Sequence, residues 1–308
     1  MLRFTIPIFN FKSSILNSMI TRLAPTPSGY LHQGNAFNFL LNWLMAREQG
    51  GKVLLRIDDL DVPRSKQEYL HDVFETLDWL GIDWDAGPAA TDDLAASWSQ
   101  SLRLPLYNSL LEQLRAQGHL FACDCSRKSL AAAGGVYQGN CIHKGIPFDQ
   151  PDVAWRVKVN VTETISFNDG WQGETIIALG LQVGSFVVRR RDGIPAYQIA
   201  SLADDVHYGI TSIARGMDLL SSTASQLYLA KLLGLGLFTQ TLFYHHPLLL
   251  DQAGHKLSKS TGSLSLHHWR KEGISASVLL ANFCKWTGLA VQDPLIKAKD
   301  ILPHWRSL

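Results

Sequence analysis

The sequence predicts an α/β fold with a parallel sheet, and three features of the first sixty residues lead to it. Apolar residues 20–24 have the character of a buried strand, and a turn rich in proline and glycine follows at 25–30. Residues 31–49 carry apolar side chains at helical spacing and end at a Gly-Gly pair. The short apolar run 53–57 is typical of a parallel strand that is buried on both faces. Together these elements predict the first half of an α/β nucleotide-binding fold.

The later elements follow from the same periodicities. Apolar spacing predicts further helices at 65–80, 105–117 and 222–233. Alternating or continuous apolar runs predict further strands at 153–161, 186–190, 195–199 and 241–245. The dipeptide Asp192-Gly193 lies between two of these runs and predicts a hairpin turn.

We expect five segments along the chain. A change of composition after residue 117 indicates an inserted small domain, and the return of α/β character near 183 closes it. The predicted segments are an N-terminal tail (1–18), the first half of the nucleotide-binding domain (19–117), the insertion (118–182), the second half (183–262) and a short helical C-terminal region (263–308).

Composition and charge exclude several classes of protein. The chain has 308 residues, of which 46% are hydrophobic and 18% charged, which is typical of a globular protein and not of a disordered or fibrous one. The net charge of +1 is far from the strongly basic charge that is typical of nucleic-acid-binding proteins. Any contact with RNA must therefore be made by a local group of residues. The apolar stretch 229–250 is interrupted by polar residues, and we predict no membrane span.

The N-terminal and cysteine patterns bear on the compartment. Residues 1–18 contain basic residues and no acid, but their apolar run is short, so a non-catalytic tail is favoured over a targeting signal. The folded part is then expected to begin near Met19. Three of the four cysteines fall between 123 and 141, which fits a metal site in a reducing compartment better than a disulfide framework. We therefore expect a cytoplasmic protein.

Two short motifs contain residue types that are suited to binding a nucleoside triphosphate. In residues 25–35, a tight turn leads into a helix N-terminus that favours phosphate, His32 can donate to a phosphate oxygen, and Gly34 allows the nucleotide to approach the backbone. In the KLSKS motif at 256–260, Lys256 and Lys259 are cationic groups suited to a triphosphate, and Lys259 is the strongest catalytic candidate. Taken alone, a helix-start histidine and a solvated basic loop explain these residues equally well.

The chain resembles the glutamyl-tRNA synthetase group of the class I aminoacyl-tRNA synthetases over residues 19–262. The motifs that carry this resemblance are RLAPTPSG at 22–29, LH at 31–32, RIDDLD at 56–61, DD at 204–205, ARGMDL at 214–219 and KLSKS at 256–260. The resemblance implies a Rossmann-type nucleotide-binding fold. Full members of the group continue into a helical anticodon-binding region, and a chain that stops at 308 is similar to the shorter glutamyl-queuosine tRNA(Asp) synthetases.

The resemblance also implies an activity and partners. Glutamate and ATP, the latter with Mg²⁺, would form glutamyl-adenylate, and the glutamyl group would pass to the queuosine base in the anticodon of tRNA(Asp). A monomer is expected. The positions that match the family's ATP-binding residues are His32, Gly34, Lys256 and Lys259, with His32 and Lys259 in catalytic roles.

The same resemblance assigns a glutamate pocket. Its matching positions are Arg22, Ala24, Thr26, Asp58, Tyr197 and Arg215. A dicarboxylic amino acid needs guanidinium groups for its carboxylates and an acid for its ammonium group, which these residue types supply. Two positions depart from the family pattern, because Thr26 stands where serine is usual and Asp58 where glutamate is usual. The shorter acid leaves a gap that a water molecule or a deeper ligand position would fill.

The cysteine cluster suggests a structural zinc site. The thiolates of Cys123, Cys125 and Cys141, with the oxygen of Tyr137, would close a tetrahedral zinc shell and leave no open position for catalysis. Three free thiols are the alternative. The resembled family carries a Cys-x-Cys, Tyr, Cys zinc site in its inserted domain, which favours zinc.

Three rival functions remain open from the sequence. A truncated glutamyl-tRNA synthetase, or a glutamate ligase with another acceptor, would use the same residues. A nucleotidylyltransferase also has a His-x-Gly turn but needs neither the KLSKS motif nor the cysteines. A tRNA-binding module without catalysis would not need His32 and both lysines.

Overall fold

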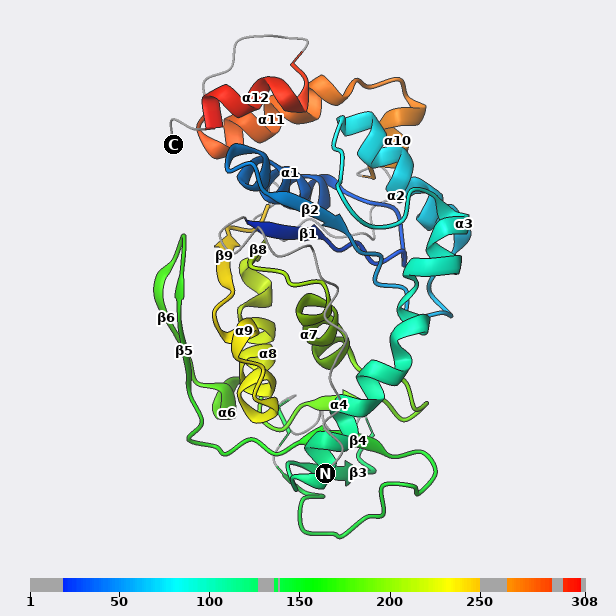
Figure 1. Cartoon of the computed structure of the whole chain (residues 1–308), viewed down its shortest axis with the longest axis vertical. Helices are drawn as coiled ribbons and strands as arrows, with labels where there is room; N and C mark the ends of the chain where they lie inside the picture. The colour runs from blue at the N-terminus through cyan, green and yellow to red at the C-terminus, as the bar shows by residue number, and fades with distance from the viewer. Residues whose placement is uncertain (1–18, 127–135, 138, 250–264, 290–295, 306–308) are drawn as a thin grey trace. The chain divides into compact units, whose positions relative to one another are not determined.

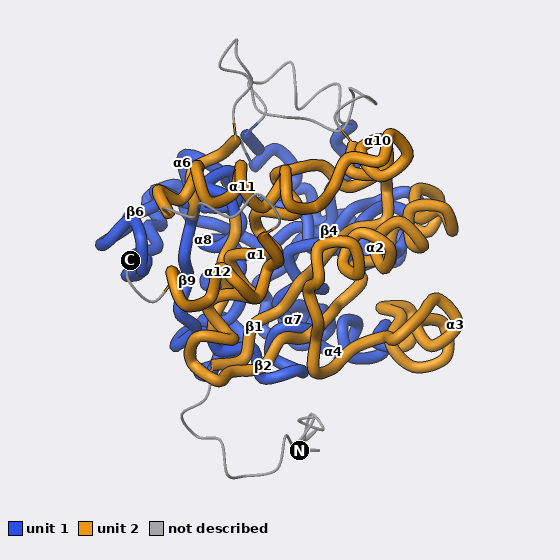
Figure 2. Tube along the Cα trace, turned by 90° about the horizontal axis from the view of Figure 1, so that it is seen from above, with its two compact units in different colours: residues 1–10, 103–211, 216–245 blue, residues 11–102, 212–215, 246–308 orange. Residues whose placement is uncertain are grey.

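The computed structural model shown in Figure 1 describes residues 19–126, 136, 137, 139–249, 265–289 and 296–305. The predicted tail 1–18 and the KLSKS motif lie outside these residues. The chain divides into two compact units, which Figure 2 distinguishes by colour. Among the described residues, unit 1 comprises 103–211 and 216–245, and unit 2 comprises 19–102, 212–215 and those after 245.

Unit 2 begins with the predicted strand, turn and helix. Strand β1 (Ile20–Leu23) pairs in parallel with β2 (Lys52–Leu55), and α1 (Gln33–Glu48) connects them. Gly51 has no side chain because a Cβ there would lie 2.4 Å from the carbonyl oxygen of Met19. The parallel pair and its helix confirm the predicted elements, with each boundary within two residues of the expected one.

Helices complete unit 2 around α1. Helix α2 (Gln67–Leu80) ends at Gly81, whose φ of 69° suits a left-handed cap, and short helical turns follow as α3 (Thr91–Asp93), η1 (Leu94–Trp98) and η2 (Gln100–Arg103). The chain returns later through α10 (Leu266–Lys271), α11 (Ala276–Thr287) and α12 (Ala298–Trp305). Phe37 of α1 packs edge-on against Phe283 of α11, with ring centroids 5.3 Å apart. Helix α1 is therefore covered by β1 and β2 on one side and by the C-terminal helices on another (Figure 1).

Unit 1 contains two groups of strands. Strands β3 (Leu120–Cys123), β4 (Ala154–Val157) and β7 (Val187–Arg189) form an antiparallel sheet in that order. Strands β5 (Ile165–Asp169) and β6 (Gly173–Ile177) form a hairpin, and β9 (Leu242–His246) runs parallel to β5. Strand β8 (Ser212–Gly216) contributes residues 212–215 to unit 2.

The helices of unit 1 pack mainly on one another. They are α4 (Leu104–Ala116), α6 (Leu179–Gln182), α7 (Tyr197–His207), the turn η3 (Met217–Leu219), α8 (Leu220–Leu233) and α9 (Gly236–Thr239). The predicted hairpin around Gly193 is only partly correct. Arg189 and Pro195 form a single bridge, and the expected second strand is instead the start of α7. Proline has no N–H to extend the ladder, and helix α7 begins two residues later.

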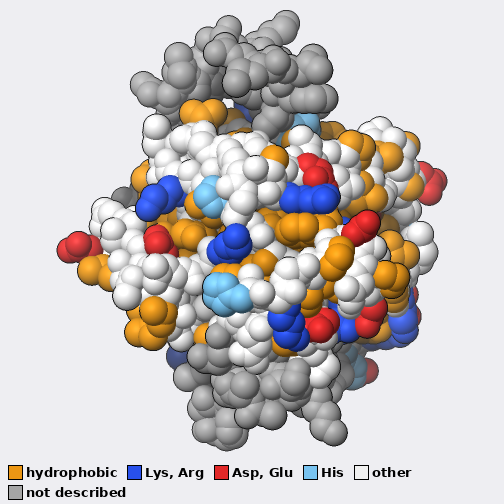
Figure 3. All heavy atoms as spheres, turned by 90° about the horizontal axis from the view of Figure 1, so that it is seen from below, with side chains coloured by type: hydrophobic (Ala, Val, Ile, Leu, Met, Phe, Trp, Pro, Cys, Tyr) orange, Lys and Arg blue, Asp and Glu red, His pale blue; other side chains and the backbone are white. Residues whose placement is uncertain are grey.

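Two surface observations bear on the expected properties. Basic and acidic side chains are interspersed on the face shown in Figure 3, in keeping with the small net charge. Within the described ranges, every helix is too short or too polar to cross a lipid bilayer.

Candidate active site

His32 begins helix α1 and has a defined hydrogen-bonding role. Its Nδ1 accepts the N–H of Gly34 at 3.0 Å, and its own N–H donates to Oδ1 of Asn35 at 3.1 Å. These two bonds form a capping box that satisfies backbone donors at the helix start. Because Nδ1 accepts a hydrogen bond, a neutral His32 carries its proton on Nε2. That N–H is the group of His32 that can donate to a phosphate.

Gly34 lies against the side-chain ring of His32, which leaves little space for a side chain at this position. A Cβ at this position would lie 2.9 Å from Cε1 of His32, which is closer than real Cβ atoms approach other groups. The sequence suggested that a nucleotide needs the space at Gly34. The structure supplies a local reason as well, because the His32 ring occupies that side of the glycine.

The residues of unit 2 that are predicted to bind the substrate glutamate lie near the carboxyl ends of its parallel strands. Arg22 on β1 is buried, Ala24 is half-buried and Thr26 is exposed. The chain after β2 runs beside this segment, because the N–H of Arg56 donates to Leu23 O at 2.8 Å and the N–H of Asp58 donates to Pro25 O at 2.9 Å. Ligands of open α/β sheets bind at this edge.

Asp58 is paired with Arg56 of the same segment. Nε of Arg56 donates to Oδ1 of Asp58 at 2.7 Å and Nη2 donates to Oδ2 at 3.1 Å. Both residues are buried, with exposed fractions of 3% for Arg56 and 8% for Asp58. The sequence predicted Asp58 as an ammonium partner and did not foresee this pairing. A carboxylate has about four acceptor positions, so the pairing orients Asp58 and still leaves it capable of accepting from an ammonium group.

The adjacent acid has a structural role. Oδ2 of Asp59 accepts from Oγ of Ser99 at 2.7 Å, and Oδ1 accepts from the N–H of Gln100 at 2.8 Å. Asp59 thereby holds the start of η2, and both of its carboxylate oxygens take part in these bonds. The predicted partner of the ammonium group is Asp58 and not Asp59.

Asn42 connects the strands that carry two of the predicted arginines. Its Oδ1 accepts from Oγ1 of Thr21 at 2.6 Å and from the N–H of Ala214 at 3.1 Å, and its Nδ2 donates to Ala214 O at 3.0 Å. Thr21 precedes Arg22 on β1, and Ala214 precedes the buried Arg215 on β8. Sequence reasoning missed Asn42, although an amide inside the apolar run 39–46 was a signal.

Tyr197 lies in unit 1 and is the first residue of α7, with an exposed fraction of 43%. The helix is held by Asp204, whose carboxylate accepts from Nε of Arg103 at 2.6 Å and from the hydroxyl of Tyr107 at 2.6 Å. Burial opposes the charge on Arg103, but Asp204 outweighs it and raises the pKa of the guanidinium. Asp204 of the DD motif therefore helps to fix the position of α7.

Lys256 and Lys259 lie outside the described residues, but the chain directly after them is in contact with the first motif. Ser265 forms a backbone bridge with His32, and the N–H of Leu266 donates to Leu31 O at 2.8 Å. The first described residues after the KLSKS motif therefore contact the first motif.

The three clustered cysteines converge in unit 1. The Sγ atoms of Cys123, Cys125 and Cys141 lie within 4.8 Å of one another, and those of Cys125 and Cys141 are 3.4 Å apart. In a tetrahedral zinc site with Zn–S bonds of about 2.3 Å, the sulfur atoms lie about 3.8 Å apart. The hydroxyl of Tyr137 accepts the N–H of Cys141 at 2.6 Å, which keeps the phenol oxygen beside the thiols. The three thiols therefore have a spacing that suits a zinc ion, and the Tyr137 hydroxyl lies next to Cys141.

The thiols differ in their tendency to ionise. Burial, together with the sulfur atoms of Cys141 and Cys123, raises the pKa of Cys125 to about 12. Burial also opposes ionisation of Cys123, but the backbone N–H of Cys125 and the Arg156 guanidinium lower the pKa of its thiol. Arg156 stacks on the Tyr137 ring at 4.3 Å from its centroid. The Cys123 thiol therefore ionises more readily than the Cys125 thiol.

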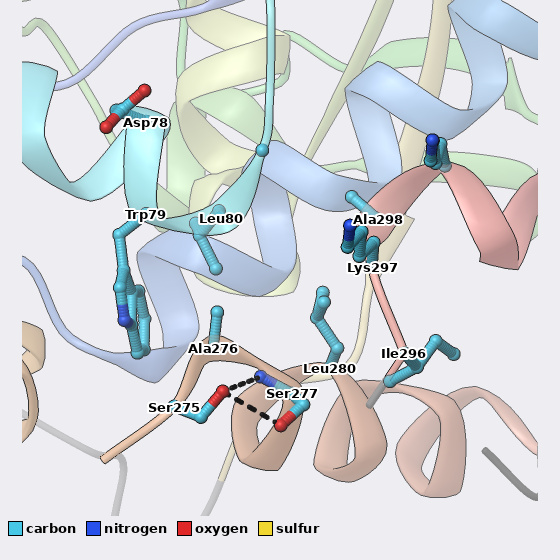
Figure 4. A pocket seen from close by; sticks show the side chains of 12 residues that line it. Asp78, Trp79, Leu80, Ser275, Ala276, Ser277, Leu280, Ile296, Lys297 and Ala298 are labelled. Atoms are coloured by element: carbon cyan, nitrogen blue, oxygen red, sulfur yellow. Dashed lines mark hydrogen bonds between the residues drawn. The ribbon is translucent and has the colours of Figure 1, made fainter. Parts of the chain in front are cut away.

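A separate cavity of about 520 Å³ lies in unit 2 between the end of α2 and the starts of α11 and α12 (Figure 4). Ser275 and Ser277 hydrogen bond to each other at its edge, and Asp78, Lys297 and Lys299 line it. None of the predicted site residues lines this cavity.

The chain has an α/β fold in which helix α1 follows a parallel strand and starts at His32. The family model described as tRNA synthetases class I (E and Q), catalytic domain, matches residues 18–299, and the chain belongs to this family. It is accordingly an ATP-dependent ligase.

Several curated relatives share the name Glutamyl-Q tRNA(Asp) synthetase. One from Pseudomonas paraeruginosa is 45% identical over 244 residues, which is 79% of this chain and 78% of the relative. One from Pseudomonas fluorescens is 44% identical over 80% of this chain and 78% of the relative. One from Pseudomonas putida is 38% identical over 91% of this chain and 88% of the relative.

Solved structures share the fold at low identity. The glutamate-tRNA synthetase from Elizabethkingia anophelis superposes with a TM-score of 0.76 at 23% identity, over 93% of this chain and 65% of that one. A glutamate tRNA ligase from Elizabethkingia meningosepticum, in complex with its amino acid, gives a TM-score of 0.75 at 23% identity, over 93% and 64% of the two chains. This chain therefore spans slightly less than two thirds of those enzymes.

Proposed function

We propose that the protein activates L-glutamate with ATP to glutamyl-adenylate and transfers the glutamyl group to the queuosine base in the anticodon of tRNA(Asp). The names of the relatives at 38–45% identity support this acceptor. The structural observation that carries the proposal is the link that Asn42 makes between the Thr21 hydroxyl and the Ala214 backbone, the residues that precede Arg22 and Arg215. Two buried arginines, on two strands tied to one residue of α1, suit a substrate with two carboxylates.

The first step of this reaction would use both sequence motifs, the one that contains His32 and the KLSKS motif. A carboxylate oxygen of glutamate attacks the α-phosphorus of ATP, the bond to the leaving pyrophosphate breaks, and glutamyl-adenylate forms. The N-terminus of α1 and Nε2–H of His32 would stabilise phosphate charge, and Lys259 would do so as pyrophosphate departs. Mg²⁺ enters with ATP as part of the substrate.

The second step would transfer the activated acyl group. A hydroxyl oxygen of the queuosine base attacks the carbonyl carbon of glutamyl-adenylate, and AMP leaves with the bonding electron pair. In the pocket, Arg22 and Arg215 would bind carboxylate groups, Asp58 would accept from the ammonium group, and Tyr197 would contribute its exposed phenol. Ala24 and Thr26 would line the site at the turn.

We further propose that Cys123, Cys125, Cys141 and Tyr137 hold a structural zinc ion. The convergence of the thiols supports this assignment. When bound, zinc would supply a cross-link between β3 and the later segment that carries Cys141. It would take no part in glutamate activation.

Amino-acid-dependent ATP–pyrophosphate exchange tests the first step. The full chain is assayed with each of the common amino acids, with and without tRNA, and we expect exchange with glutamate in the absence of tRNA. Exchange with a different amino acid alone would contradict the specificity. A flat result throughout would favour the tRNA-binding module.

The acceptor is tested with labelled glutamate. tRNA(Asp) with and without queuosine is incubated with the enzyme and cut into an anticodon fragment and a 3′ fragment. We expect label in the anticodon fragment of the modified tRNA. Label on the 3′ fragment would instead identify a truncated glutamyl-tRNA synthetase.

A further inference from the structure

Asp72 on α2 contacts the backbone that leads into His32. It is almost fully buried, with an exposed fraction of 1%, and its Oδ2 accepts the N–H of Leu31 at 3.1 Å. Its Oδ1 accepts from Nη2 of Arg270 on α10 at 2.7 Å. One carboxylate therefore joins the first motif to the helix that follows the second motif.

The same backbone is held on its other side by α10. The carbonyl of Leu31 accepts the N–H of Leu266 at 2.8 Å. The ring of Tyr30 is stacked on His267, with centroids 4.2 Å apart and an angle of 12° between the planes. Both polar groups of the Leu31 backbone and the side chain before it are thus in defined contacts, and His32 is the next residue.

A metal site is the competing explanation for this cluster. Donor atoms of Asp72, Glu75 and His267 lie within 4.8 Å of one another. Arg270, however, already places a guanidinium between the acids, at 2.7 Å from Asp72 and 2.9 Å from Glu75, and donates to the hydroxyl of Thr76. A divalent cation at the same place would face this fixed positive charge, so the cluster is an ion-pair network.

We propose that Asp72 is a positioning residue for ATP, which acts by fixing the Leu31 backbone and hence the place of His32. The inference rests on the proposed role of His32 in ATP binding. A shift of the helix start would move Nε2 of His32 relative to the phosphates, and a displacement of about 1 Å can reduce a rate by about 100-fold. Asp72 itself makes no contact with substrate in this role.

A double-mutant cycle between Asp72→Asn and His32→Ala tests this coupling. Asparagine has the size of aspartate but presents an N–H₂ to one of its two donors, Leu31 or Arg270. We expect Asp72→Asn to lower kcat/KM for ATP in the exchange reaction by about 10- to 100-fold, while KM for glutamate stays within about twofold. In the His32→Ala background the same change should cost less than about twofold, because the two residues act through one group.

Glu75→Gln is the matched control. It removes another acid from the same Arg270, but its side chain is 63% exposed and does not contact the Leu31 segment. Exposed ion pairs contribute little, so we expect a change within about twofold in both backgrounds. Melting temperatures of all variants separate a loss of fold from a loss of positioning.

The ATP dissociation constant, measured by calorimetry for every variant, keeps this inference distinct from the proposed function. A protein that binds ATP but lacks glutamate-dependent exchange would refute the proposed function, and the binding cycle would still decide the role of Asp72. Equal costs of Asp72→Asn with and without His32 would overturn the inference. So would a loss explained by melting temperature alone, or a wild-type protein that binds no ATP.

Discussion

The side-chain amide of Asn42 forms hydrogen bonds with both polar groups of the Ala214 backbone. The amide donates to the carbonyl at 3.0 Å and accepts the N–H at 3.1 Å, and the two residues are 172 positions apart in the chain. The same oxygen accepts the hydroxyl of Thr21. One side chain of α1 therefore binds the residues that precede Arg22 and Arg215, through the hydroxyl of Thr21 and the backbone of Ala214.

Replacing this amide should affect both stability and glutamate binding. Asn42→Leu leaves the Thr21 hydroxyl and both polar groups of Ala214 without a partner in the core, so we expect the free energy of unfolding to fall by about 2–5 kcal/mol. KM for glutamate in the exchange reaction should rise, because Arg22 and Arg215 lose their common support. The control is Asn38→Ala, which removes only a 3.5 Å contact on the same helix. Equal effects of the two variants would contradict the role of Asn42.

The Arg56–Asp58 pair should resist neutral substitution. Asp58→Asn leaves the Arg56 guanidinium buried without its counter-charge, and breaking such a pair costs about 3–5 kcal/mol. Urea unfolding measures this loss, and exchange kinetics should show weaker glutamate binding. Asp58→Glu keeps the charge and should retain most of the stability. Asp61→Asn, which removes a charge that lies 3.5 Å from the exposed Arg64, serves as control.

The cysteine cluster should contain zinc in the purified protein. We expect one zinc ion per chain by elemental analysis and its loss in Cys141→Ser. Because a structural metal contributes directly to folding, zinc removal should lower the melting temperature of unit 1. Cys284→Ser changes a buried cysteine outside the cluster and should keep the metal. A wild-type protein without zinc, with unchanged stability in Cys141→Ser, would refute the assignment.

Asp204 should contribute to the stability of unit 1, in which it lies on the helix that begins at Tyr197. Asp204→Asn leaves the charge of Arg103 uncompensated, and we expect a loss of about 3–5 kcal/mol in unfolding free energy. Tyr107→Phe removes only one hydroxyl from the same group and should cost about 1 kcal/mol. Urea unfolding of both variants provides the measurement. A smaller loss in Asp204→Asn than in Tyr107→Phe would be inconsistent with a buried ion pair.

Asp169 should make the protein sensitive to acid. Burial opposes its ionisation, but His245, whose Nδ1 lies 2.6 Å away, and backbone N–H groups hold the pKa of Asp169 below its ordinary value. A lowered pKa gives stability that is fully present above the unfolded value of about 3.9 and is lost as the pH falls through the folded value.

The test compares urea unfolding at about pH 7 with unfolding at about pH 3, below the ordinary aspartate pKa of about 3.9. Wild type should lose unfolding free energy between these conditions, and Asp169→Asn, although less stable at neutral pH, should lose less. Equal losses in the two proteins would show that Asp169 does not contribute to the acid sensitivity.

The local elements of unit 2 were predictable from the sequence because their signals are local. Apolar spacing identified β1, α1 and α2, and the glycine pair after α1 marked where that helix ends. The same kind of signal misjudged the segment after Gly193, where a bridge at Pro195 replaces a strand. A single residue of pairing leaves too little pattern to distinguish a strand from the approach to a helix.

The sequence by itself determined the α/β elements, the family motifs and the candidate residues, because periodicity and motif spacing are written along the chain. Only the tertiary structure decided that Arg56 pairs with Asp58, that Asn42 joins Thr21 to Ala214, and that Asp72 joins Leu31 to Arg270, 198 residues later. Such contacts depend on where whole helices and strands lie in space. A polar side chain carries no local signal of the partner that folding brings to it.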